Sequence, residues 1–397
     1  MRKLMILGAT LTQVPLVKAA KELGYHTIVA SIDGNYPAFD VADEKCVVDI
    51  TSPADVLDKA QKLGIDGIAT CCMDTPVRAV GYVAEHMGLC GLKEQSAIIC
   101  NDKYLMKDCF ERNGINSSRY MKITCENDLE AAYKVLTFPL VIKAVDLQAS
   151  RGVYVVKSPK EALECYRKIL TITKQSYCII EEFIKGEEFG AQAFVYNGEI
   201  LFVLPHGDFD YTKRTSVPIG HYAPLDKSDE ILDAARKEAI AAIRALELNN
   251  CAVNIDMIYK DGKVYMLELT GRAGATNLPE LVSIYFGIDY YKMIAMMAMG
   301  DDPRKEFNKR ASTATANASH FLYVEQDGVL KSIDNANSSD DADIAMLRIY
   351  AKPDDKLNAF VDGKDRLGEV VVKGKSTEYC KNKILEVINN IKFNLKE

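Results

Sequence analysis

Along the first hundred residues, short apolar runs alternate with longer amphipathic segments that have the period of a helix. Short apolar runs at residues 4–7, 27–30, 46–48 and 67–70 predict buried strands, and amphipathic segments at 13–23, 53–63 and 76–87 predict helices between them. Strands that alternate with helices form a parallel sheet covered on both faces. The turn at Gly8 lacks the GxGxxG pattern of dinucleotide sites, whereas Asp33 and Asp74 follow strand ends, where such sheets bind ligands.

The pattern changes from residue 101 onward. Asn101 opens an amphipathic helix, residues 138–144 and 154–156 predict strands, a long antiparallel region runs from 177 to 203, and a helix over 230–246 has Ser228 as its N-cap. Further strands and a last amphipathic helix follow residue 311. We therefore predict an α/β (α+β) protein with domains at 1–100, 101–310 and 311–397, the middle one carrying a lid subdomain at about 112–177.

Residues 254–272 predict a β-hairpin that turns at Asp261-Gly262. Its alternation gives one apolar face, formed by Val253, Ile255, Met257, Tyr259, Tyr265, Leu267 and Leu269. The opposite face carries Asp256 and Glu268. A two-residue turn would pair Asp256 with Leu267, whereas a three-residue loop would set it across from Glu268, with Cβ atoms about 5 Å apart. The alternation favours the three-residue loop, because only that register gives each face a consistent character.

Two carboxylates so close together suit magnesium, and Arg272 beyond them suits phosphate or a carboxylate. The alternative is a surface hairpin with solvated charges. Lys143 likewise either extends from an edge strand to solvent or lies buried beside an anion such as polyphosphate.

Two further segments each have an ordinary structural interpretation beside a nucleotide-binding one. Ser150-Arg151-Gly152 is either a plain connection or a loop that folds over phosphates. Residues 181–184 are either a solvated strand end or a hinge that hydrogen-bonds an adenine edge, and Glu188 is placed to bind ribose hydroxyl groups.

Composition restricts the class of protein. The 397 residues carry a net charge of -7, which argues against nonspecific nucleic-acid binding. The eleven cysteines are scattered without any CxxC pair, as expected for reduced thiols. With no signal peptide and no membrane-spanning apolar run in the sequence, we expect a cytoplasmic protein without a membrane partner.

In this order and spacing, the motifs resemble the ATP-grasp superfamily, in its carboxylate–amine ligase (amino-acid ligase-like) branch. The resemblance covers nearly the whole chain and rests on Asn101-Asp102-Lys103, Val141-Ile142-Lys143, Ser150-Arg151-Gly152-Val153, Glu181-Glu182-Phe183-Ile184, Gly186-x-Glu188-Phe189, and Asp256 with Glu268-x-Thr270-x-Arg272. It implies that Lys103, Lys143 and the Ser150 loop contact ATP phosphates. It also implies an adenine hinge at Glu181, Glu182, Phe183 and Ile184, a ribose contact at Glu188, and catalysis by Arg272 and Lys143.

The resemblance further implies that Asp256 and Glu268 bind Mg²⁺, with Mn²⁺ as an alternative ion. The family's second metal motif is usually Glu-x-Asn, but here Thr270 replaces the asparagine, which puts a second metal in question; Asn254 on the same face is a candidate to compensate. The implied reaction joins a small carboxylate and an amine, one of them an amino acid, into an amide through an acyl phosphate, with release of ADP.

Two alternatives remain open at this stage: a bicarbonate-activating carboxylating ligase of the purine or biotin type, and a nucleotide-binding regulatory protein that has lost catalysis. The resemblance also implies a homodimer. His206 and His221 are interpreted either as structural histidines or as contacts at the acceptor site, and Lys213 and Arg214 either as carboxylate contacts or as a solvated turn.

Overall fold

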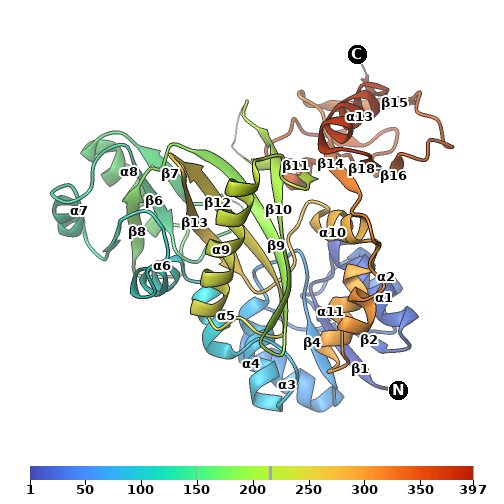
Figure 1. The fold of residues 1–397 in the computed structure, drawn as a ribbon, viewed down its shortest axis with the longest axis horizontal. Helices are drawn as coiled ribbons and strands as arrows, with labels where there is room; N and C mark the ends of the chain where they lie inside the picture. Colours follow the sequence, from blue (N-terminus) through green and yellow to red (C-terminus); the bar gives the residue numbers. More distant parts are fainter. Residues whose placement is uncertain (149, 214–216, 397) are drawn as a thin grey trace. The chain divides into compact units, whose positions relative to one another are not determined.

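The computed structural model describes residues 1–148, 150–213 and 217–396 (Figure 1). The chain forms two compact units. The first comprises residues 1–203, 228–273 and 291–303, and the second comprises 204–227, 274–290 and 304–397. The domain limits at residues 100 and 310 remain a prediction.

A parallel four-stranded sheet opens the first unit, in the order β3-β2-β1-β4. Its elements are β1 (Lys3–Leu7), α1 (Val14–Glu22), β2 (His26–Ser31), α2 (Pro37–Val41), β3 (Glu44–Val47), α3 (Pro53–Leu63), β4 (Gly67–Ala69) and α4 (Val77–Met87). Met5 and Ile28 are fully buried in its core, as their uninterrupted apolar runs require. The α/β fold class predicted from the alternation is therefore confirmed.

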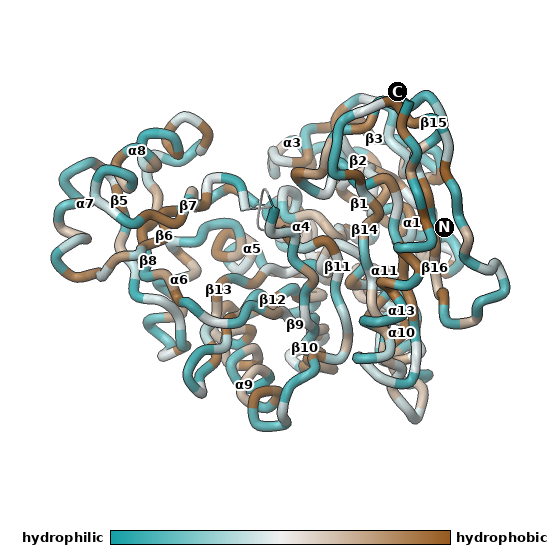
Figure 2. Tube along the Cα trace, turned by 90° about the horizontal axis from the view of Figure 1, so that it is seen from above, coloured by the Kyte–Doolittle hydropathy of each residue, from teal (hydrophilic) through white to brown (hydrophobic). Residues whose placement is uncertain are grey.

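An antiparallel sheet of order β5-β8-β6-β7 follows within the same unit. Its strands are β5 (Tyr120–Ile123), β6 (Leu140–Ala144), β7 (Val153–Val156) and β8 (Cys178–Glu182), with α7 (Glu126–Ala132) and α8 (Pro159–Leu170) lying against it (Figure 1). The tube is brown along β6, a strand whose apolar residues Leu140 and Ile142 are fully buried (Figure 2). Because β6 lies between β8 and β7, the edge-strand interpretation of Lys143 is wrong.

The remaining strands of this unit are β9 (Glu187–Tyr196), β12 (Cys251–Lys260), β13 (Lys263–Thr270) and the beginning of β10 (Glu199–Tyr211). Four helices accompany them: α5 (Glu94–Cys100), α6 (Lys103–Arg112), α9 (Asp229–Ala245) and α11 (Tyr290–Ala298). Ser228 is the N-cap of α9 as predicted, and α9 lies along the β12–β13 hairpin (Figure 1). Its buried stripe of Ala235, Ala239, Ala242 and Ile243 follows the helical period.

The β12–β13 hairpin pairs Asp256 directly with Glu268, as predicted, but by another route. Lys260 pairs with Lys263, so the loop has two residues, and positive φ angles at Asp261 (49°) and Gly262 (81°) fit a tight hairpin turn. The predicted three-residue loop is therefore wrong. A β-bulge beyond the Met257–Met266 pair leaves Leu267 without an opposite residue and restores the pairing of the carboxylates.

The bulge also corrects the predicted apolar face. Between the turn and the bulge, Val264 and Met266 are buried, whereas Tyr265 and Leu267 are only half-buried. On the other strand, Val253, Ile255 and Met257 are buried as predicted. One extra residue reverses the facing of a strand because side chains alternate with a period of two.

The second unit contains the end of β10, β11 (Val217–Ala223), β14 (Ala316–Leu322), β18 (Gly368–Gly374) and β16 (Ile344–Ile349), hydrogen-bonded in that order. A small sheet of β17 (Lys356–Leu357), β15 (Gly328–Asn335) and β19 (Ile391–Leu395), together with α10 (Leu278–Phe286), α12 (Arg304–Phe307) and α13 (Thr377–Asn389), completes it. Phe360 and Tyr211 contribute to one of its cores. Within the described residues of the chain, none of the helices has both the length and the apolar character needed to cross a bilayer.

Candidate functional site

The carboxylates of the hairpin lie in a polar cluster within the first unit. Asn254 pairs in register with Thr270, next to the Asp256–Glu268 pair. The amide of Asn254 donates to Asp256 Oδ1 (3.3 Å) and accepts at Oδ1 from Gln192 Nε2 (2.7 Å). This brings two carboxylates, one amide and one hydroxyl onto neighbouring positions of two strands, a set of oxygen-bearing side chains that suits a hard cation.

Lys103 extends toward this cluster from the first turn of α6. Its Nζ lies 3.1 Å from Glu268 Oε2 and donates to the carbonyl oxygen of Leu147 at 2.9 Å. Asp102 is the N-cap, and its Oδ1 accepts hydrogen bonds from the N–H groups of Tyr104 and Leu105. The cap fixes the start of the helix, and with it the lysine.

Arg272, just past β13, is held by Asp74, which follows β4. Arg272 Nε donates to Asp74 Oδ1 at 2.6 Å, and both side chains are largely buried. Burial of Asp74 opposes ionisation, but the charge of Arg272 outweighs it and lowers the pKa of this carboxyl. A small cavity beside this pair is lined by polar side chains that include Asp74, Asn101, Lys103, Gln148, Asn254, Glu268, Thr270 and Arg272. Asp74, which follows a strand end, therefore lies beside the same polar cluster as the hairpin carboxylates.

Lys143 belongs to a buried ion triad. Glu181 pairs in register with Val141, so Lys143 lies diagonally from Glu181 on the same face of the sheet, and the two side chains form an ion pair. Lys107 of α6 reaches the other oxygen of Glu181 at 2.8 Å, and Ser118 donates to that oxygen at 2.5 Å.

Charge is unequal in this triad, because two lysines share one carboxylate. Burial opposes ionisation of Glu181, but the two lysines hold its pKa well below the usual range. Burial lowers the pKa of Lys107, whereas for Lys143 the attraction of Glu181 outweighs burial and raises the pKa. Only 3% of the Lys107 side chain and 14% of that of Lys143 are exposed, so Lys143 is the cation that an incoming anion reaches more readily.

The hinge segment continues from Glu181. The N–H of Glu182 donates to Arg119 O and that of Phe183 to Pro139 O, while the Glu182 carboxylate pairs with Arg119. Among the residues that the structure describes, the N–H of Ile184 is the first of this segment without a hydrogen bond.

Gly186 follows the hinge where the chain passes close to β12. A Cβ built at this glycine would lie 2.4 Å from Ile258 Cγ2 and 2.5 Å from Tyr259 O, so only glycine fits. Glu188 is exposed on β9 and pairs in register with Ile258. Its charge contributes to raising the pKa of Lys143, so the predicted ribose contact lies near the buried ion triad.

The Ser150 loop is described from Ser150 onward. Ser150 (φ 57°) and Gly152 (φ 68°) have left-handed backbone conformations, and the N–H of Arg151 donates to Gln148 O at 3.3 Å. Gln148 also lines the polar cavity, so this loop adjoins it.

The two histidines lie in the second unit, on β10 and β11, and both contact Asp208. Burial lowers the pKa of His206, and although burial also opposes ionisation of Asp208, the two imidazoles keep its pKa low. Lys213 pairs with Glu325 at 2.8 Å, and Arg214 lies outside the described residues.

Sequence reasoning missed Lys107, Ser118 and Asp208. Lys107 carried a signal, since it lies four residues after Lys103 and so shares its face of the helix. Asp208 is two residues from His206 along a strand, which puts both on one face.

Comparisons with known proteins show the family to which the chain belongs. Residues 101–245 match the model of the phosphoribosylglycinamide synthetase ATP-grasp (A) domain, and residues 320–396 match L-amino acid ligase C-terminal domain 2. The crystal structure of phosphoribosylglycinamide synthetase from Anaerococcus prevotii is 43% identical, with a TM-score of 0.87 over 100% of both chains. That of an L-amino acid ligase from Bacillus licheniformis is 20% identical, with a TM-score of 0.83 over 100% of this chain and 99% of that one.

Among curated proteins, the alanine–anticapsin ligase of Bacillus subtilis is 23% identical over 61% of this chain and 56% of its own length. The chain belongs to the ATP-grasp family. The predicted family is thereby confirmed, and the protein is an ATP-dependent ligase of the ADP-forming kind.

Proposed function

We propose that this protein joins a small carboxylic acid to an amine, with an amino acid among its substrates and with cleavage of ATP to ADP and phosphate. The observation that carries the proposal is the Asp256–Glu268 carboxylate pair, with Lys103 Nζ 3.1 Å from Glu268. A cation and a triphosphate need acidic and basic side chains at one place, and this cluster offers both.

The buried ion triad of Lys107, Lys143 and Glu181 supports phosphate binding. Two ammonium groups against one carboxylate leave an excess positive charge in a largely desolvated place, which is unfavourable until another anion arrives. In our proposal Lys103, Lys143 and the Ser150-Arg151-Gly152 loop receive the phosphates. Glu181 holds Lys143, residues 182–184 bind the adenine edge, and Glu188 binds ribose.

The metal-binding residues fit Mg²⁺ or Mn²⁺, since Asp256, Glu268 and Asn254 present oxygen donors on adjacent pairs. When bound, the ion neutralises charge that spreads over the phosphate oxygens. Thr270 takes the place of a better ligand, and the Asn254 oxygen is hydrogen-bonded to Gln192, so we propose one metal as the minimum.

The proposed reaction has two steps. The substrate carboxylate attacks the γ-phosphorus, which breaks its bond to ADP and forms an acyl phosphate while Lys143 and Arg272 stabilise negative charge. The amine then attacks the acyl carbon, phosphate leaves, and the amine loses a proton as the amide forms. Asp74 keeps Arg272 charged and oriented for this role. Closure of the lid subdomain at about 112–177 would protect the acyl phosphate from water.

Two observations support an amino acid as substrate. The match of residues 320–396 is to an L-amino acid ligase domain, and Glu268-x-x-x-Arg272-x-Gly274 resembles that branch. The 43% identity to phosphoribosylglycinamide synthetase from Anaerococcus prevotii supports a second candidate, the formation of phosphoribosylglycinamide.

The test measures ADP release from the full chain with ATP and Mg²⁺ in parallel mixtures that contain pairs of amino acids, glycine with phosphoribosylamine, or an amine with bicarbonate. The products are identified by mass spectrometry. Release that requires two amino acids and yields a dipeptide supports the proposal. Phosphoribosylglycinamide formation would establish the second candidate. A requirement for bicarbonate would favour a carboxylating ligase, and ATP binding without turnover a regulatory protein.

A matched pair of variants tests the metal assignment. Glu268→Ala should abolish turnover, whereas Glu126→Ala, which removes an exposed carboxylate paired with Arg167, should leave it unchanged. Full activity in Glu268→Ala would refute the assignment. A cytoplasmic location and a homodimer complete the proposal.

A further inference from the structure

A cluster of two imidazoles and a carboxylate lies in the second unit, whereas the residues proposed to bind ATP belong to the first. His206 and Asp208 are two positions apart on β10, and Asp208 pairs directly with His221 across β11. Side chains two apart on a strand, and those directly opposite on its neighbour, share one face of the sheet. The backbone register therefore brings these three together.

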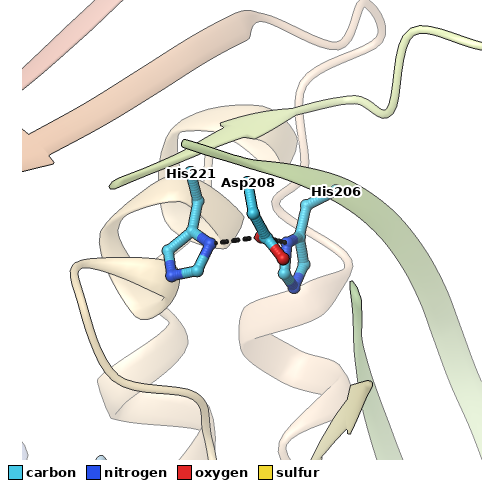
Figure 3. A group of neighbouring side chains, drawn as sticks. All are labelled: His206, Asp208 and His221. Atoms are coloured by element: carbon cyan, nitrogen blue, oxygen red, sulfur yellow. Dashed lines mark hydrogen bonds and ion pairs between the residues drawn. The ribbon is translucent and has the colours of Figure 1, made fainter. Parts of the chain in front are cut away.

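The ring nitrogens converge on a single oxygen. Asp208 Oδ1 lies 2.6 Å from His221 Nδ1 and 3.2 Å from His206 Nδ1, and Figure 3 shows the carboxylate between the two rings. One such atom from each residue lies within 4.8 Å of the others. Ligands about 2.0–2.2 Å from a tetrahedral ion are themselves about 3.3–3.6 Å apart, so each of the two distances to Asp208 Oδ1 needs to lengthen by about 1 Å or less.

Burial gives the cluster a second feature. His206 is 3% exposed and His221 5% exposed. Within the described residues, His206 Nε2 is buried without a hydrogen-bond partner. The backbone N–H of His221 donates to Ser319 Oγ at 3.2 Å, which helps to fix this strand position. A buried polar atom without a partner is unfavourable, so a structural role in hydrogen bonding alone leaves part of the cluster unexplained.

We propose that His206, Asp208 and His221 form a binding site for a divalent transition-metal ion of the zinc class. Imidazole ligands favour Zn²⁺, Co²⁺ and Ni²⁺ over Mg²⁺, so this site and the carboxylate cluster of the first unit select different ions. Three protein ligands on two strands leave a fourth position open to water or to a small donor molecule.

The test uses the full-length protein, freed of metal by a chelator, in the Glu268→Gln background and with excess Mg²⁺. These conditions remove competition from the carboxylate cluster. Titration with Co²⁺ should show one equivalent bound, with the visible absorption of a four-coordinate site. Binding through any of the eleven cysteines is recognised by a thiolate charge-transfer band in the near ultraviolet.

Asp208→Asn, which preserves shape, and His206→Ala should each weaken Co²⁺ binding about 100-fold or more, because they remove a ligand. The matched control is His320→Gln, since His320 is also buried in the second unit but has its Nδ1 at the carbonyl oxygen of Phe321. It should bind as the parent does.

Thermal unfolding provides a second measurement if His206→Ala folds poorly. Zn²⁺ should raise the unfolding temperature of the parent and not that of Asp208→Asn. Absence of a stoichiometric Co²⁺ equivalent, a spectrum of thiolate ligation only, or equal affinity in Asp208→Asn would each overturn the proposal and leave the cluster as a hydrogen-bonded triad.

Discussion

The buried triad of Glu181, Lys107 and Lys143 allows a sharp test of its electrostatics. In Glu181→Gln the two lysines keep their positions but lose the carboxylate that both contact. Removing one partner of a buried ion pair typically costs about 3–5 kcal/mol, because the remaining charge stays desolvated. We expect a loss of this size in the free energy of unfolding at pH 7.

The neighbouring residue provides the control. Glu182 pairs with Arg119, whose side chain is 65% exposed, and surface pairs of this kind contribute about 0–1 kcal/mol. Glu182→Gln therefore tests the same substitution, one position along the chain, without the buried charges. Urea unfolding of both variants compares the two losses of free energy. The unfolding is followed by far-ultraviolet circular dichroism, because the chain contains no tryptophan for fluorescence.

The effect of pH has a defined sign. The folded-state pKa of Glu181 is depressed, so its contribution is complete above its unfolded value of about 4.5 and is lost as pH falls through the folded pKa. In Glu181→Gln, burial without the carboxylate lowers both lysine pKa values, so raising the pH toward 10 should reduce the deficit as the lysines lose their protons.

A further variant separates charge from shape. Lys107→Met in the Glu181→Gln background removes one of the two unpaired cations and should recover part of the lost stability. The reasoning is refuted if Glu181→Gln loses no more stability than Glu182→Gln, or if its deficit is unchanged between pH 7 and pH 10.

Three other predictions concern single contacts. Asp74→Asn leaves Arg272 buried beside a neutral amide and should lower the unfolding free energy by about 3 kcal/mol in urea titration; no change would refute the pairing. Lys143→Ala should weaken ATP binding at least about tenfold by calorimetry, whereas the exposed Lys157→Ala should not, and equal affinities would exclude phosphate contact. Phe110→Ala empties a site that is 0% exposed and should cost about 3–5 kcal/mol in thermal or urea unfolding, and a cost below about 1 kcal/mol would contradict its core position.

Local patterns were sufficient for the elements with strong periodicity. The helix over residues 53–63 agrees with α3 residue for residue, and the first four strands lie within one or two residues of their predicted positions. Short amphipathic helices such as α5 and α7 were not predicted, because seven residues give too little periodicity to distinguish a helix from a loop.

Contacts between residues far apart in the sequence were harder to predict than the helices and strands. A buried Lys143 does need an anion, but the sequence cannot show that Glu181, 38 positions along the chain, supplies it before any nucleotide does. The same holds for Asp74 and Arg272, which meet because the segment after β4 hydrogen-bonds to the segment after β13, from the N–H of Cys72 to the carbonyl oxygen of Ala273. Chemical types are readable in sequence, whereas the choice of partner depends on topology.

The bulge at Leu267 has a consequence for comparing sequences in this family. It separates the hairpin into a tip, whose facing is set by the two-residue turn, and a base, whose facing is set by the carboxylates. A relative that has one more residue in the loop and one fewer at the bulge would keep the same carboxylates opposite each other. Its aligned letters would nevertheless show two compensating gaps and inverted hydrophobicity between them. An alignment that forbids such gaps would keep the acidic pair in place, because the insertion and the deletion cancel, but it would shift every position between the turn and the bulge by one residue. The altered hydrophobicity there would then be mistaken for loss of the hairpin.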